Sequence, residues 1–218
     1  MKTIKQIFVV VIFCSMFFVN NSFGQLKNFG IKGGLNLSNV NYEVIYDLYT
    51  ENKIGFNVQI FYDFLNYTNV SLSAETGYSQ KGFDFNYPIT NEIGEAISSE
   101  TIHTKLNYIN TDILARFSLN SKTVNPYISI GPVVGFYTGY SISSSGPNDT
   151  LFQVNILLEN LKSPAFGLIL GAGTEFKNLM SATLIAEVRY NFDFTNSSDL
   201  GAVNFKNKVV EFNAGIIF

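Results

Sequence analysis

The chain has 218 residues and a net charge of −3, and only 14% of its residues are charged. A mild acidic balance argues against nucleic acid as a partner. The single Cys, at position 14, lies in the segment that we expect to be removed, which excludes disulfides and thiolate metal sites from the mature chain.

The first 24 residues have the pattern of a cleaved signal peptide, and residues 25–218 form the expected mature domain. A short basic segment precedes an apolar run, Ile7–Val19, and a small-residue cleavage pattern, Ser22–Gly24. The apolar run is shorter than the roughly 20 residues of a membrane-spanning helix. A lipoprotein Cys is disfavoured because Phe13 precedes Cys14 and the apolar run continues beyond it.

Eight segments alternate between apolar and polar residues with a period of two, which predicts eight β-strands. In chain order they are Phe29–Val40, Lys53–Phe64, Asn69–Gln80, Lys105–Leu119, Asn125–Gly139, Ala165–Phe176, Ser181–Phe194 and Lys208–Phe218. Pro132 cannot donate to a strand ladder, so we expect a bulge or a bend there.

Short and long connections alternate strictly between these segments. The long ones are Asn41–Asn52, Lys81–Thr104, Tyr140–Pro164 and Thr195–Asn207. Short turns on one rim and long loops on the other are typical of an eight-stranded antiparallel up-and-down transmembrane β-barrel with both termini on the periplasmic side. The absence of a second long apolar run means that any membrane insertion is by strands.

A soluble periplasmic lipocalin-like barrel with an apolar ligand is the main alternative. It would place the apolar faces inside and the polar faces outside. The apolar faces carry almost no Lys or Glu, and the polar faces are rich in Gly, Ser and Asn, which favours the membrane barrel in an outer membrane of a Gram-negative bacterium.

Several segments resemble the PorT-like outer-membrane β-barrel family, over essentially all of residues 25–218. The resembling segments are Gly30–Asn36, Tyr108–Phe117, Asn125–Gly135, Phe166–Phe176 and Ala186–Tyr190. Asp112 departs from the pattern, which usually has Pro there. The resemblance implies an outer-membrane location and no common catalytic residues, and some relatives are tied to protein secretion across the outer membrane.

Charged residues on the expected inner faces predict a network inside the barrel, because an unpaired buried charge is costly. The residues are Lys32, Lys53, Glu75, Arg116, Glu175, Glu187, Arg189 and Glu211. A packed polar plug is the interpretation that we favour over a proton or ion path, since an eight-stranded barrel is just wide enough for side chains.

The first long loop offers a candidate binding surface, with Tyr42, Tyr46 and Tyr49 beside acidic residues. A girdle of interfacial aromatics is the alternative for these tyrosines. In the third long loop, the helical spacing from Val154 to Leu161 indicates either a short helix that caps the barrel or an extension of the sixth strand.

An outer-membrane hydrolase with its active site in the loops is a third possibility, with His103 near Ser98, Ser99 and Glu100. Residues this close in an extended loop rarely converge into a catalytic dyad. We therefore expect no enzyme, and no pattern indicates a cofactor or a metal ion.

The expected function is a structural or binding role through the long extracellular loops, including an accessory role in secretion or surface assembly. The expected partners are outer-membrane lipid, an unknown protein or glycan at the loops, and the barrel-assembly machinery. The machinery would recognise the last strand, because a final Phe218 resembles the C-terminal insertion signal of outer-membrane barrels.

Overall fold

The computed structural model describes residues 28–43, 50–91, 93, 96–119, 121–144, 158, 161–179, 182–195 and 204–218, and eight strands make up most of them. In chain order these are β1 (Phe29–Glu43), β2 (Thr50–Asn66), β3 (Val70–Thr90), β4 (Ala96–Ser118), β5 (Val124–Ser144), β6 (Ala165–Leu179), β7 (Ala182–Asp193) and β8 (Asn204–Ile217). The expected signal peptide lies outside the described residues.

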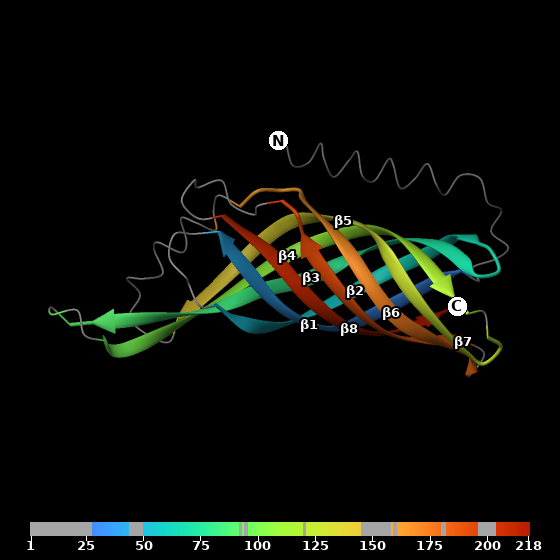
Figure 1. The fold of residues 1–218 in the computed structure, drawn as a ribbon, viewed down its shortest axis with the longest axis horizontal. Coiled ribbons are helices and arrows are strands. Elements are labelled where there is room, and N and C mark those ends of the chain that lie inside the picture. The colour runs from blue at the N-terminus through green and yellow to red at the C-terminus, as the bar shows by residue number, and fades with distance from the viewer. Residues whose placement is uncertain are drawn as a thin grey trace.

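The strands form a closed barrel in which each pairs antiparallel with its sequence neighbours and β1 pairs with β8 (Figure 1). β1 begins where β8 ends, and the Phe218 N–H donates to the Phe29 carbonyl at 2.9 Å. The short connection from Asn66 to Val70 lies at this same end of the barrel, because β2 runs toward it. The predicted up-and-down topology is confirmed.

Apolar side chains face outward along the middle of the barrel and polar side chains face inward. On β2, Phe56, Val58 and Ile60 are 46–47% exposed, whereas Asn57 and Gln59 are 1–2% exposed. A soluble barrel would have the opposite arrangement, because water would face its outer wall. The lipocalin-like alternative is therefore wrong, and the outward apolar stripes form the surface that hydrocarbon covers.

Three strands run well past their predicted ends, so the prediction of a long loop over Lys81–Thr104 is wrong. β3 and β4 stay paired from Lys81 opposite Leu106 to Ile89 opposite Ser98, and β5 continues to Ser144. Beyond the membrane the outward face of each strand meets water instead of lipid and carries polar side chains, so the outward apolar alternation is lost while the ladder hydrogen bonds continue. The alternation therefore indicates the membrane-spanning part of each strand rather than its whole length.

Pro132 lies within β5 without shifting its register. The pairs Asp112–Val133 and Ala115–Ile130 belong to one continuous register, and the pairing to β4 is interrupted between them. Because Pro lacks an N–H, the ladder loses a bond there instead of bulging. The expected bulge is absent from this stretch of β5.

Candidate functional site: the barrel interior

The centre of the barrel interior holds a carboxylate surrounded by three cations. Glu75 on β3 accepts from Lys32 Nζ at 2.7 Å, from Arg116 Nη2 at 2.9 Å, and from Arg189 Nη1 at 2.8 Å. All four side chains are at most 2% exposed and come from four different strands. Burying a charge is tolerated where opposite charges and hydrogen bonds satisfy it, and Glu75 meets both conditions.

Two more carboxylates complete this ion cluster. Glu187 lies 3.3 Å from Lys32 Nζ, pairs closely with Arg189 Nε and accepts from the Tyr127 hydroxyl at 2.9 Å. Asp63 pairs with Arg116 Nη1 at 3.2 Å. The cluster thus links β1, β2, β3, β4, β5 and β7 across the lumen.

Aromatic rings close the periplasmic side of the ion cluster. The Phe61 ring lies 5.3 Å from Lys32 Nζ and 5.0 Å from the Arg116 guanidinium, and the Tyr127 ring lies 5.6 Å from that guanidinium. Phe61 and Tyr127 pack with Ile185 in one buried cluster. Cations over aromatic faces gain favourable electrostatic contact, so these rings both seal the lumen and hold the basic side chains.

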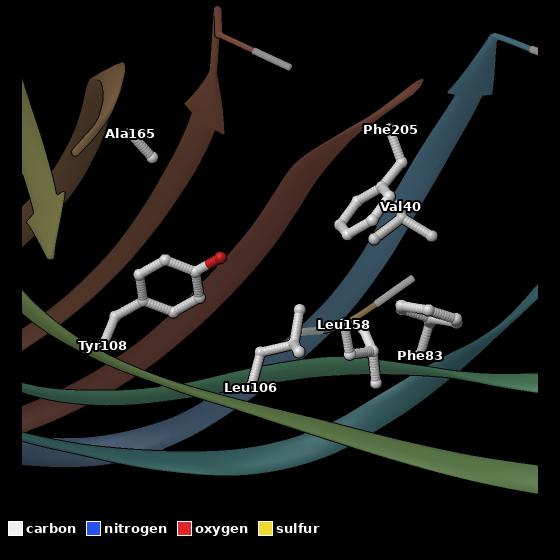
Figure 2. Close-up of a cluster of buried hydrophobic side chains, with 7 residues drawn as sticks. All are labelled: Val40, Phe83, Leu106, Tyr108, Leu158, Ala165 and Phe205. Atoms are coloured by element: carbon white, nitrogen blue, oxygen red, sulfur yellow. The ribbon is translucent and has the colours of Figure 1, made fainter. Parts of the chain in front are cut away.

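The extracellular half of the lumen is filled mainly by apolar side chains from five strands and one connection (Figure 2). This extracellular apolar cluster consists of Val40, Phe83, Leu106, Tyr108, Leu158, Ala165 and Phe205. Leu158 belongs to the connection between β5 and β6 and is fully buried, with Leu161 packed against the cluster. Part of the predicted cap therefore contacts the lumen, and Val154 and Leu157 lie outside the described residues.

A polar group borders the apolar cluster. Lys81 Nζ lies 3.4 Å from Asp193 and 4.9 Å from the Tyr108 ring centroid, and Asn207 donates to Asp193 at 2.8 Å. All of these side chains are buried. Layers of aromatic, ionic and apolar side chains thus fill the lumen from one end to the other.

Five of the eight residues expected in the lumen meet in the ion cluster, namely Lys32, Glu75, Arg116, Glu187 and Arg189. The other three lie elsewhere: Lys53 pairs with Asp84 at 2.8 Å, Glu175 accepts from Asn125 at 3.0 Å, and Glu211 is fully buried. No hydrogen bond to Glu211 is made by the described part of the chain.

Five buried charged residues are absent from the predicted lumen set, namely Asp63, Lys81, Glu100, Asp112 and Asp193. Strand alternation already places Asp63, Asp112 and Asp193 on inner faces, so their positions were predictable. The positions of Lys81 and Glu100 were not predictable, because both residues fall in the segment expected to be a loop. Asp112 lies 3.7 Å from Arg189 Nη1, at the margin of the ion cluster.

The structure does not place the residues expected at the loop binding surface and at the loop active site in one described site. Tyr46 and Tyr49 lie outside the described residues, and Tyr42 belongs to β1, although the structure does not describe its side chain. His103 lies within β4 rather than in a loop, with its Nδ1 2.9 Å from Asp84 Oδ2. Ser99 is four residues away along the same extended strand, about 13 Å at 3.3 Å per residue, so it cannot form a dyad with His103.

Within the described ranges, no three or more His, Cys, Asp or Glu side chains are arranged to hold a metal ion. No helix in the described part of the chain is long and apolar enough to cross a membrane.

Comparison with known proteins identifies the family. Residues 23–199 match the family model described as "Outer membrane protein beta-barrel domain". The chain belongs to this family. It is therefore an integral protein of the bacterial outer membrane, as the outward apolar surface of the barrel requires.

Solved structures to which this chain is similar include three outer-membrane proteins. OprG from Pseudomonas aeruginosa is 13% identical with a TM-score of 0.46, covering 88% of this chain and 96% of that chain. Outer membrane protein W from E. coli is 15% identical with a TM-score of 0.42, covering 88% and 98%. Ail of Yersinia pestis is 16% identical with a TM-score of 0.37, covering 86% and 97%. A search of curated proteins gave no match.

Proposed function

We propose that this barrel is a non-enzymatic binding protein, in which a filled lumen makes a rigid platform and the extracellular strand extensions contact a partner. The observation that carries the proposal is the length of the β3–β4 hairpin. Its pairing reaches Thr90 opposite Ala96, whereas β6 and β7 pair only as far as Gly167 opposite Asp193 (Figure 1). Segments that project from a rigid scaffold are well suited to carry binding residues.

The outward face of the extension presents hydrogen-bonding side chains in register across three strands. Asn86 donates to Glu51 at 2.7 Å, and Thr101 donates to Asn86 at 2.7 Å. Toward the membrane, Asp84 contacts both Lys53 and His103. This chain of contacts stiffens the base of the hairpin, so a partner would bind it with less loss of conformational entropy.

The tip of the hairpin carries apolar side chains in contact with water. Ile93 is 85% exposed and Ile97 is 66% exposed. Apolar residues on a projecting, hydrogen-bonded support fit contact with a protein surface better than contact with a glycan, which needs polar groups and aromatic faces. Tyr42, Tyr46 and Tyr49 would supply the aromatic faces if the partner were a glycan.

We further propose that the protein acts as an accessory of secretion or surface assembly, on the basis of its resemblance to PorT-like barrels. The last strand would guide insertion through the barrel-assembly machinery. Phe218 is 57% exposed and stacks on Phe29 with ring centroids 6.4 Å apart, so its ring is accessible at the periplasmic end.

Photo-crosslinking in native cells tests the binding role. A photoreactive residue replaces Ile97 at the hairpin tip, and a matched control replaces Leu119, which is 77% exposed at the periplasmic turn. We expect a discrete cross-linked partner from position 97 that is absent from position 119. No discrete product from position 97 in cells that carry folded barrel, or the same product from both positions, would contradict the proposal.

A further inference from the structure

The outer wall of the barrel has an open groove where β7, β8 and β1 meet. Its lining includes Tyr190, Phe192 and Phe194 from β7 and the residues just after it, Lys206 and Lys208 on β8, and Asn41 on β1. Asp193 also borders the groove, but its side chain is 3% exposed and bound to Lys81 inside the barrel. The groove is separate from the lumen and from the β3–β4 hairpin.

The groove lies at the edge of the apolar belt. The last wholly apolar row across the three strands is Leu37, Val210 and Tyr190 in register, and these side chains face outward. The next row on the same face is Asn39, Lys208 and Phe192, and the row after it pairs Asn41 with Lys206. Outward residues on a strand are about 7 Å apart, so both lysines stand within about 14 Å of the last apolar row.

This edge belongs to the outer leaflet. β8 begins near Lys206 and ends at the periplasmic rim, where the short turns lie. Short turns face the periplasm in outer-membrane barrels, and the opposite rim faces the cell exterior. The groove is therefore level with the headgroups of the outer leaflet, whose characteristic lipid is a phosphorylated glycolipid.

The side chains suit a ligand with both phosphate and sugar or acyl parts. Lys206 and Lys208 are two residues apart on one face, so their ammonium groups can approach one or two phosphates together. No ion pair joins Lys208 to any acidic residue in the described ranges. Tyr190 stacks with Phe192 at 5.6 Å, and Phe192 meets Phe194 edge-to-face at 5.2 Å, which gives a continuous aromatic surface.

We propose that this groove binds the phosphorylated headgroup of an outer-leaflet glycolipid, with Lys206 and Lys208 on phosphate and the aromatic surface against the sugar or the first acyl carbons. Interfacial lysines and aromatics are common on membrane proteins without a specific ligand. The arrangement differs here because two lysines, three connected rings and a groove coincide within three rows. Binding would fix this wall of the barrel in the outer leaflet.

Binding can be measured by native mass spectrometry of the refolded full barrel, titrated with bis-phosphorylated lipid A. Dephosphorylated lipid A and inorganic phosphate are the comparison ligands. Lys105→Gln is the matched control variant, because Lys105 is an exposed outward lysine of β4 two rows above Ile109. Heat-modifiable gel migration verifies that each variant is folded.

We expect affinity for lipid A to fall about fivefold with each of Lys206→Gln and Lys208→Gln and about 25-fold in the double variant. Phe192→Ala should weaken binding of both lipid forms, and Lys105→Gln should change neither. Unchanged binding in the double variant, an equal loss in Lys105→Gln, or equal affinity for dephosphorylated lipid A would overturn the proposal. Displacement of lipid A by millimolar inorganic phosphate would show a site for the free ion and would overturn the lipid as its occupant.

Discussion

The two halves of the lumen fill the same narrow space in different ways. Around the ion cluster, β4 contributes Arg116 and Asp112, whereas four and six residues before Asp112, toward the extracellular end, its inward residues are Tyr108 and Leu106. β8 changes in the same way, from Glu211 to Phe205. An eight-stranded barrel leaves room only for side chains. Charged or apolar side chains can fill it, provided that they occupy the volume and that buried polar groups find partners.

The difference between the halves lies in how each responds to a lost side chain. In the periplasmic half, every cation of the ion cluster depends on carboxylates from other strands, so removing one leaves buried charge without compensation. In the extracellular half, removing a side chain leaves a void whose cost grows with its volume. The periplasmic half is therefore sensitive to charge and the extracellular half to size.

The largest expected effect is from Glu75→Gln. This change keeps the shape of the side chain but leaves Lys32, Arg116 and Arg189 without their shared carboxylate. We expect a loss of about 3–5 kcal/mol in the free energy of unfolding. Urea unfolding of the barrel in lipid vesicles measures this free energy. A loss below about 1 kcal/mol would contradict the special sensitivity of the periplasmic half of the lumen to a change of charge.

Leu106→Ala tests the extracellular half. Leu106 is fully buried in the same apolar cluster as Val40 and Phe83 (Figure 2), so truncation should cost about 3 kcal/mol. Leu35→Ala is the matched control, because Leu35 is 59% exposed on the lipid-facing wall. The same urea assay should show a smaller loss for the control, and an equal or larger one would indicate that the extracellular cluster is loosely packed.

Glu211→Gln has the smallest expected effect and the opposite sign to Glu75→Gln. Glu211 is fully buried, and neither of its carboxylate oxygens accepts a hydrogen bond from the described residues. Neutralising a buried carboxylate that accepts no hydrogen bond from the described residues should raise the free energy of unfolding by about 1 kcal/mol. A loss of stability comparable with that of Glu75→Gln would show that Glu211 belongs energetically to the ion cluster.

Period-two alternation was sufficient to predict the eight strands and the face that each turns to lipid. On β2, for example, the apolar residues from Ile54 to Phe64 are the ones that the structure exposes. Alternation failed at Lys81 and His103, because beyond the membrane the outward faces of β3 and β4 meet water instead of lipid and no longer carry a row of apolar side chains.

The membership of the ion cluster was harder to predict than its location. Glu75 and Arg189 are 114 residues apart and lie on β3 and β7, so their contact depends on barrel closure and on the length of the arginine side chain. Lys53 shows where the assignment of residues to inner and outer faces by alternation fails. A register irregularity between Asn52 and Asn57 accompanies its pairing with Asp84 rather than with the buried cluster.

The most direct test of a lumen closed in both halves is the ion conductance of the wild-type barrel in a planar lipid bilayer. We expect no steady conductance above that of the protein-free bilayer, because aromatic, ionic and apolar layers succeed one another along the axis. A steady, reproducible conductance from folded wild-type protein would contradict the filled lumen and the platform role that rests on it.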